Sequence, residues 1–171
     1  MPRWFPSRPF VSRFFPWIAL FGIAALAGCG GGSRLPPPME TPGPGVMTRT
    51  ERQVWEGVRR WQGVPYKWGG NGRSGVDCSG LAVAVYRNLY GLRLPRTTKD
   101  QVRVGRAVPF HQLRPADLIF FRDRSGSRHV GIYLRNRMFI HASKSRGGVV
   151  VSRLDAPHWR ETFWVARRVA G

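Results

Sequence analysis

Hydrophobic positions divide the chain into a helical part and, after it, a part with the periodicity of strands. In the first helical stretch the apolar residues recur at helical spacing: Val54, Trp55, Val58 and Trp61. This spacing predicts an amphipathic helix over roughly residues 49–62. Thr48, with Glu51 three positions later, has the form of a capping box, so we expect the helix to begin there.

A second helical stretch begins at a cysteine. Between Cys78 and Tyr90 the apolar residues of one face are Leu81, Ala82, Val85, Tyr86 and Leu89. Gly91 lies where the residue after a helix is commonly glycine, and we expect Asp77 or a neighbouring loop residue to cap the start. The preceding segment, "GVPYKWGGNGRSG", contains too many glycines for regular structure and is predicted to be a loop. Cys78 is therefore expected to open a buried helix.

Strand signals dominate the second part of the chain, after a short helix predicted near Thr97 or Thr98. Alternating and continuous apolar runs predict strands at residues 118–121, 129–134, 138–142, 148–152 and 163–169. Helices followed by a meander of strands are typical of an α+β domain. We therefore predict an α+β fold in which N-terminal helices pack on a mainly antiparallel sheet of about five to six strands.

The N-terminal residues have the features of an export signal. Their positive charges are Arg3, Arg8 and Arg13. The apolar stretch "FFPWIALFGIAALAG" then leads through small residues to Cys29. A membrane-spanning anchor is the alternative, but the run is shorter than the roughly 20 residues that cross a bilayer, and it contains Pro16. We predict a signal peptide over residues 1–28.

The ending "LAGC" resembles the bacterial lipobox, in which the cysteine is lipid-modified and becomes the first residue of the mature protein. The resemblance implies that Cys29 carries acyl chains such as palmitate and holds the protein on a membrane surface; a plain secretory signal is the alternative. Because Gly30 rather than an aspartate follows, it implies the outer membrane of a Gram-negative cell, with the protein facing the periplasm. Residues 29–47, rich in glycine and proline, are predicted to be a flexible tether to a domain over residues 48–171.

The formal net charge of the chain is +19, which favours anionic partners. The arginines are dispersed rather than gathered in a basic arm, and an exported protein seldom meets chromosomal nucleic acid, so we expect no nucleic-acid partner. Anionic lipid head groups and the carboxylates of cell-wall peptides fit the predicted compartment better. We expect the domain to be a monomer.

Cys29 and Cys78 are the two cysteines of the chain. If Cys29 is acylated, Cys78 has no partner within the chain for a disulfide, and a lone thiol in an oxidising compartment needs a reason. The alternative is an inert cysteine that packs as a small hydrophobic residue. A helix N-terminus lowers the pKa of a thiol and offers backbone N–H groups to an oxyanion. Cys78 is therefore a candidate nucleophile, and it needs a base.

Two histidines lie in strand-like runs and are candidates for that base. The four histidines of the chain are His111, His129, His141 and His158. His129 in "RHVGIYL" and His141 in "RMFIHAS" flank a turn signal around Asn136, which predicts a hairpin. With residues 135–137 as its loop, His129 pairs with Ser143 and lies diagonal to His141 on the same face; a strict two-residue turn would put the rings on opposite faces. We predict the former, with His129 as the base and His141 fixing its tautomer.

Five blocks of the sequence resemble the NlpC-like cysteine peptidases of bacterial cell walls. In order, the blocks are "VPYKWGGNGRSGVDCSGL", "LPRTT", "ADLIFF", "HVGIYL" and "FIHAS", and the resemblance extends over about residues 50–169. It implies a papain-like fold in which Cys78 is the nucleophile, His129 the general base and His141 the polar residue that orients the base.

The same family pattern implies roles for three further residues. Tyr66 matches a tyrosine that helps to form the substrate and oxyanion site, with a packed loop aromatic as the alternative. Asp77 and Ser79 flank the nucleophile where the family recognises its substrate, and helix capping is their alternative role. Ala116 replaces a usual glycine, which predicts a local difference in a turn. The departures from the pattern around the hairpin are Arg128, Arg135 and Arg137, and they leave the exact substrate open.

The reaction that the resemblance implies is hydrolysis of an amide bond in the stem peptides of peptidoglycan. The bond is either the one between D-glutamate and the diamino acid or the crosslink between stem peptides. Papain-like chemistry needs no cofactor and we predict no metal, with a zinc site formed by Cys78 and the two histidines as the alternative. Two other classes of function stay open: an inactive wall-binding or scaffolding lipoprotein, and an amidase or acyltransferase that uses the same triad.

Overall fold

The structure, a computed structural model, describes residues 45–170. The predictions for the signal peptide, for Cys29 and for most of the tether concern residues outside this range. Within the described range, no helix combines the length and the apolar character needed to cross a membrane.

Helices of the described part are α1 (Arg49–Arg59), α2 (Cys78–Tyr90), α3 (Thr98–Gln101) and α4 (Pro157–Thr162), with a short 3-10 helix, η1 (Phe110–Gln112). Its strands are β1 (Asn71–Gly72), β2 (Gly75–Val76), β3 (Arg106–Val108), β4 (Leu118–Arg122), β5 (Arg128–Tyr133), β6 (Met138–Ser143), β7 (Gly148–Arg153) and β8 (Phe163–Arg168). The predicted helices and strands correspond to α1, α2, α3 and β4 to β8. The structure adds β1, β2, β3, η1 and α4, which the sequence pattern did not indicate.

Local sequence signals begin and end the helices as expected. The Thr48 hydroxyl accepts a hydrogen bond from the N–H of Glu51, and the Glu51 carboxylate accepts one from the N–H of Thr48, which completes the capping box of α1. Asp77 caps α2 by accepting from the N–H of Gly80. Gly91 ends α2 in the left-handed conformation, with a φ of 66°.

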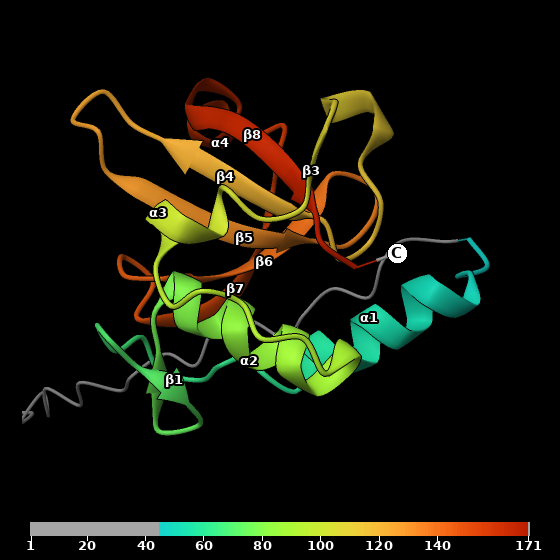
Figure 1. Cartoon of the computed structure of the whole chain (residues 1–171), viewed down its shortest axis with the longest axis horizontal. Coiled ribbons are helices and arrows are strands. Elements are labelled where there is room, and N and C mark those ends of the chain that lie inside the picture. Colours follow the sequence, from blue (N-terminus) through green and yellow to red (C-terminus); the bar gives the residue numbers. More distant parts are fainter. Residues whose placement is uncertain (1–44, 171) are drawn as a thin grey trace, which may run out of the picture. The chain divides into compact units, whose positions relative to one another are not determined.

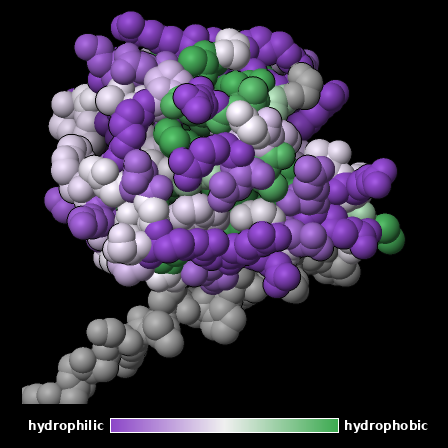
Figure 2. Space-filling view, turned by 60° about the horizontal axis from the view of Figure 1, so that its bottom comes forward, coloured by the Kyte–Doolittle hydropathy of each residue, from purple (hydrophilic) through white to green (hydrophobic). Residues whose placement is uncertain are grey.

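A six-stranded antiparallel sheet with the order β3-β8-β4-β5-β6-β7 is the centre of the described part. The helices α1 and α2 lie against one side of it, and α4 lies beside β4 and β8 (Figure 1). This arrangement confirms the predicted α+β fold, with N-terminal helices on a mainly antiparallel sheet. In Figure 2 the side of the molecule that carries α1 and α2 is turned towards the viewer, and hydrophilic residues dominate it.

Alternation of side chains along the strands gives the sheet two apolar layers. In β4, Leu118 and Phe120 belong to the layer against which the apolar side chains of α1 and α2 pack. Phe121 and, in β6, Phe139 belong to the other layer, where their rings lie 5.2 Å apart and Trp159 of α4 covers Phe121 at 4.7 Å between centroids. This second, aromatic layer is the one that surrounds the two strand histidines.

Candidate active site

Cys78 is the first residue of α2, and its thiol lies where three elements meet. The sulfur is 3.7 Å from the Thr98 hydroxyl at the start of α3. It also accepts hydrogen bonds from the backbone N–H groups of Val130 in β5 and of Ser79 in α2. Because donors of this kind stabilise a thiolate more than a thiol, the surroundings of the sulfur suit a nucleophile.

In the resting protein, burial outweighs these donors and raises the pKa of the Cys78 thiol. The Asp77 carboxylate acts in the same direction, because a second negative charge beside it is unfavourable. The N–H of Ser79 at the helix N-terminus acts to lower this pKa, as expected, but burial outweighs it and the net shift is upward. The thiol is neutral near pH 7 and has to lose its proton during a reaction.

His129 in β5 and His141 in β6 are joined by a hydrogen bond. Nε2 of His129 lies 2.9 Å from Nδ1 of His141, and the rings are nearly perpendicular, with 4.9 Å between their centroids. The other ring nitrogen of His141, Nε2, lies 3.0 Å from the Ser152 hydroxyl in β7. The two rings thus meet, as the expected hairpin geometry requires, and a third side chain continues the row.

The loop of the β5–β6 hairpin has the predicted length. The N–H of Leu134 donates to the carbonyl of Met138, so residues 135–137 form the loop. Two of them, Asn136 and Arg137, adopt positive φ values of 49° and 62°. This loop length sets the parity of the hairpin, and with it the face on which both histidines lie.

The hydrogen-bonded ladder between β5 and β6 ends before it reaches the histidines. Its last pair towards them is Ile132 with Ile140, so the predicted pairing of His129 with Ser143 is not part of the ladder. Beyond this point, the backbone N–H of Val130 bonds the sulfur of Cys78 instead. The first turn of α2 therefore approaches β5 where the ladder has ended, next to His129, the predicted base.

Burial lowers the pKa of both histidines. The pKa of His129 falls to about 4, with a further contribution from the positive charge of His158. Burial also lowers the pKa of His141 well below its usual range, and the charges of His129, Arg146 and His158 add to this effect. Both rings are therefore neutral near pH 7, and a neutral imidazole with one bare nitrogen can accept a proton.

The thiol and the histidine pair line different hollows. Cys78, Arg96 and Arg128 line one of about 350 Å³, and the histidines line another of about 590 Å³. Within residues 45–170, no hydrogen bond joins the Cys78 thiol to the His129 ring. Arg128 and His129 are consecutive residues of β5 and each lines one hollow, so β5 forms the border between them. A ligand would have to lie across this border to contact both groups.

Asp77 is held by donors from several parts of the chain. Its carboxylate accepts from the N–H of Gly69 at 2.9 Å, the N–H of Gly80 at 2.7 Å, the Ser79 hydroxyl at 3.0 Å and the Arg96 guanidinium at 2.7 and 3.0 Å. Burial acts to raise the pKa of Asp77, but the hydrogen bonds from Arg96, Gly80 and Ser79 outweigh it, and the pKa is lowered. Asp77 therefore stays ionised and fixes the loop that leads into α2.

Arg96 connects this carboxylate to the rest of the loop. Its guanidinium donates to the Ser79 hydroxyl at 2.9 Å and to the Gly70 carbonyl at 3.1 Å, in addition to the carboxylate of Asp77. Asp77 and Ser79 are both buried. These contacts support the capping and loop-holding role for both residues, while their predicted part in substrate recognition stays a prediction.

Tyr66 lies near the thiol. Burial raises the pKa of its phenol, and negative charge on Cys78 and on Asp77 acts in the same direction. Its backbone is fixed by a bridge to Val76 and by the donation of its N–H to the carbonyl of Gly147 at 2.9 Å. The position fits the predicted oxyanion and substrate role, which stays a prediction.

The structure adds three residues to those that the sequence singled out: Arg96, Thr98 and Ser152. Arg96 and Thr98 belong to the block "LPRTT", which marked the family resemblance and could have named them. Ser152 had no local signal, because its contact with His141 depends on the pairing of β6 with β7.

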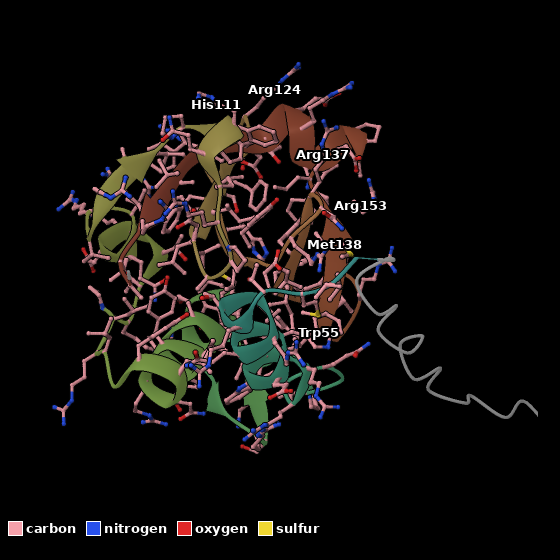
Figure 3. All side chains as sticks on the ribbon, turned by 90° about the vertical axis from the view of Figure 1, so that its right-hand side faces the viewer. Trp55, His111, Arg124, Arg137, Met138 and Arg153 are labelled. Atoms are coloured by element: carbon pink, nitrogen blue, oxygen red, sulfur yellow. The ribbon has the colours of Figure 1, made fainter. Side chains whose placement is uncertain are left out.

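Of the hairpin arginines, Arg128 alone lines the hollow of Cys78. Arg135 is paired with Glu51 at 3.8 Å, and Arg137 with Asp155 at 3.9 Å. Figure 3 shows His111 and Arg137 near the outside of the described part. The described residues contain no group of three or more His, Cys, Asp or Glu side chains arranged to hold a metal ion.

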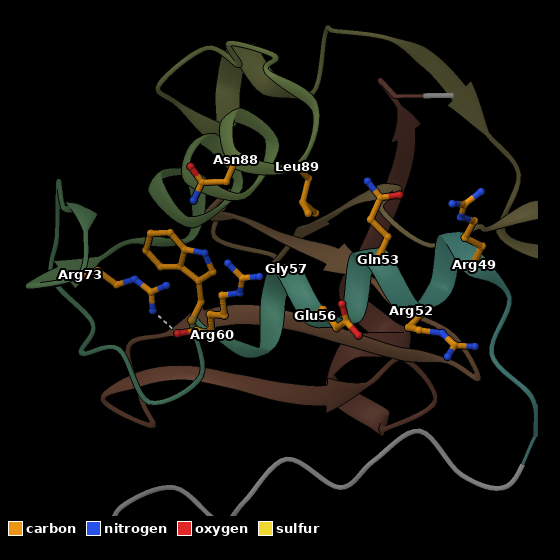
Figure 4. Close-up of a pocket in the computed structure, with 10 residues that line it drawn as sticks. Arg49, Arg52, Gln53, Glu56, Gly57, Arg60, Arg73, Asn88 and Leu89 are labelled. Carbon is orange, nitrogen blue, oxygen red and sulfur yellow. Dashed lines mark hydrogen bonds between the residues drawn. The ribbon is translucent and has the colours of Figure 1, made fainter.

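A further hollow, of about 450 Å³, lies between α1 and the end of α2 (Figure 4). Four arginines line it: Arg49, Arg52, Arg60 and Arg73. None of the predicted site residues is among its lining side chains, so we assign it no part in the chemistry of Cys78.

The chain belongs to the NlpC/P60 family, whose profile matches residues 63–168. It is 47% identical over 114 residues to the "Probable endopeptidase NlpC" of Escherichia coli, covering 66% of this chain and 73% of that protein. It is 45% identical over 109 residues to the "Murein DD-endopeptidase MepS/Murein LD-carboxypeptidase" of Escherichia coli, covering 64% of this chain and 57% of that protein.

Solved structures of the family have the same fold. An NlpC/P60 family protein from Bacillus cereus is 31% identical, with a TM-score of 0.64 over 72% of this chain and 41% of that one. The peptidoglycan hydrolase RipB from Mycobacterium tuberculosis is 30% identical, with a TM-score of 0.58 over 78% of this chain and 75% of that one. The described domain therefore has the papain-like fold that the sequence resemblance implies.

Proposed function

We propose that this protein is a cysteine peptidase that hydrolyses an amide bond in the stem peptides of peptidoglycan. The observation that carries the proposal is the thiol of Cys78 at the start of α2, next to the strand of the His129–His141 pair, in a domain of the NlpC/P60 family. The relatives named murein DD-endopeptidase and peptidoglycan hydrolase support this substrate class.

In the proposed reaction the neutral His129 ring takes the thiol proton as the sulfur of Cys78 bonds the carbonyl carbon. The resting pKa values disfavour a preformed thiolate–imidazolium pair, because the thiol pKa is raised and the His129 pKa is lowered to about 4, so we place the proton transfer in the same step as the attack of the sulfur. The Thr98 hydroxyl and the N–H of Val130 stabilise negative charge that develops on the sulfur. Tyr66 and the N–H groups at the start of α2 are our candidates for binding the oxyanion.

The intermediate then collapses. The carbon–nitrogen bond breaks, and His129 gives its proton to the leaving amine. Water attacks the remaining thioester with His129 as base, and the acyl group leaves as a carboxylate while the sulfur of Cys78 regains a proton. The hollows on either side of β5 fit this sequence, with the acyl part on the side of Cys78 and the amine product on the side of His129.

Arg96 and Arg128 are our candidates for recognising the carboxylates of the stem peptide. Both line the hollow of Cys78. The exposed Arg128 guanidinium is able to bind a carboxylate in a bidentate manner. The terminal N–H groups of Arg96 are bonded to Asp77, Ser79 and Gly70, so Arg96 contributes its positive charge. Trp68, 85% exposed, lies in the same lining and offers an apolar surface to the peptide backbone.

Purified muropeptides incubated with the full chain test the proposal. Mass spectrometry of the products should show new free amino termini on stem peptides with the wild type and none with Cys78→Ala. Identical profiles for the two proteins would remove the enzymatic function and favour the wall-binding alternative. Products in which the acyl group has passed to another amine would favour the acyltransferase, and the mass of the shortest product identifies the bond that is cut.

We also propose that Cys29 is lipid-modified and holds the protein at the outer membrane, facing the periplasm. The motif "LAGC" followed by Gly30 supports this. Cells that express the chain in the presence of labelled palmitate should yield a labelled protein, and Cys29→Ala should abolish the label while Cys78→Ala keeps it. Label that persists in Cys29→Ala would contradict the anchor.

A further inference from the structure

We propose that Ser152 is a positioning residue of the site: its hydroxyl accepts the Nε2 proton of His141, and this keeps Nδ1 of His129 bare for the thiol proton. The catalytic consequence rests on the proposed function. The protonation pattern itself is a property of the resting protein and is tested separately.

The three side chains form a row across three adjacent strands. Ser152 in β7 pairs with Phe139 in β6, so it lies diagonal to His141 on the same face of the sheet. Its hydroxyl is 3.0 Å from Nε2 of His141, and Nδ1 of His141 is 2.9 Å from Nε2 of His129. Each contact is within normal hydrogen-bonding distance, so the row is continuous from β7 to β5.

One proton lies between the two rings, and the ring nitrogen to which it is covalently bound decides whether His129 can be a base. If His129 carries it on Nε2, then Nδ1 of His129 is bare and His141 carries its own proton on Nε2, which it donates to Ser152. If His141 carries it on Nδ1, then His129 holds its proton on Nδ1 and has no bare nitrogen for the thiol. Only the first arrangement is productive.

The productive arrangement becomes obligatory once His129 has accepted the thiol proton. Both nitrogens of the His129 imidazolium then carry protons, so Nδ1 of His141 must accept and Nε2 of His141 must donate. His141 is 1% exposed, and its ring lies between those of Phe139 and Trp159, with centroid distances of 4.9 and 4.8 Å. Among the described residues, Ser152 is the acceptor that Nε2 of His141 has within reach.

Removal of that acceptor leaves a buried N–H without a partner at the moment when charge develops on His129. Ser152→Ala should therefore lower kcat about tenfold, since it destabilises the imidazolium. KM should change by less than about twofold, since Ser152 lines neither the hollow of Cys78 nor that of the histidines. Ser152→Thr keeps a hydroxyl at the same position and should restore most of kcat.

Nitrogen-15 NMR of the imidazole rings, with the full chain at neutral pH, tests the protonation pattern directly. In the wild type, both His129 and His141 should carry their proton on Nε2. Ser152→Ala should shift the rings towards a mixture of tautomers, and Ser152→Thr should keep the wild-type pattern. Ser143→Ala is the matched control, because the Ser143 hydroxyl bonds Ser145 and the N–H of Arg146 rather than an imidazole.

A wild-type His141 that carries its proton on Nδ1 would overturn the proposal without any variant. So would a Ser152→Ala protein with unchanged imidazole signals, or one whose kcat falls no further than that of Ser143→Ala. If no protein cleaves muropeptides but the NMR pattern is as expected, the proposed function fails and the assignment of Ser152 as acceptor stands.

Discussion

Two Asp–Arg pairs in this domain differ in how far water reaches them. Asp117 and Arg168 are joined by two hydrogen bonds of 2.6 and 2.7 Å, with side chains 1% and 8% exposed. Asp77 and Arg96 are joined at 2.7 Å, with side chains 11% and 38% exposed. We call the first the sealed pair and the second the open pair.

The sealed pair connects distant parts of the chain and faces no hollow of the site. Arg168 of β8 also donates to the carbonyl of Gln112 at 2.9 Å, and Asp117 also accepts from the N–H of Arg114 at 2.7 Å. All its charges are therefore satisfied inside the fold. The open pair holds the loop before α2 and leaves part of the Arg96 guanidinium beside Cys78. The same chemistry thus serves the fold in one place and the site in the other, and exposure decides which.

The largest expected effect is on the sealed pair. Asp117→Ala leaves the buried Arg168 charge without its partner and should lower the free energy of unfolding by about 3–5 kcal/mol. Asp77→Ala should lower it by less, because water reaches Arg96. Denaturant unfolding of the two variants beside the wild type measures the difference, and equal losses would break the comparison.

As the pH is lowered, we expect His129 in the site to be protonated before the paired carboxylates are. The folded pKa of His129 is about 4, below its ordinary value of 6.5. The unfolded chain therefore binds a proton at higher pH than the folded chain. The unfolding free energy keeps its full contribution from His129 above about pH 6.5, and it falls as the pH approaches 4. His129→Gln should flatten the slope of unfolding free energy against pH in this range. His111→Gln, at an exposed histidine on η1, is the control, and an equal flattening there would contradict the assignment.

The open pair should be more important for activity than for stability. Arg96→Lys keeps the charge but loses the fork that bonds Asp77, Ser79 and Gly70 together. We expect kcat/KM for muropeptides to fall at least about tenfold, while the unfolding free energy changes by about 1 kcal/mol. Arg93→Lys, in the same segment, should change neither. A large loss of stability in Arg96→Lys would place this pair with the sealed one.

The smallest expected effect is next to the sealed pair, at Ala116. This residue has a φ of 74°, where glycine is favoured, and its carbonyl accepts from the Tyr86 hydroxyl. Ala116→Gly should relieve the strain and raise the unfolding free energy by about 1 kcal/mol. Ala107→Gly, in the extended strand β3, should lower it by about 0.5–1 kcal/mol. A loss of stability in Ala116→Gly would show that the turn is not strained.

Much of this domain could be predicted because its signals are local. The capping box at Thr48, the helix α2 from Cys78 to Tyr90 and the strands from β4 to β8 follow from residue spacing over a few turns or strand positions. The two short strands β1 and β2 have no such pattern, because glycines occupy half of their positions.

The sequence by itself determined that Cys78 opens a helix and that the hairpin loop puts both histidines on one face, because backbone periodicity and loop length decide these properties. Tertiary structure decided the rest. It raised the pKa of Cys78, since only packing determines burial, and it ended the β5–β6 ladder where α2 approaches. It also brought Ser152 to His141 and Arg96 to Asp77, since these contacts join strands and loops whose alignment no local pattern records.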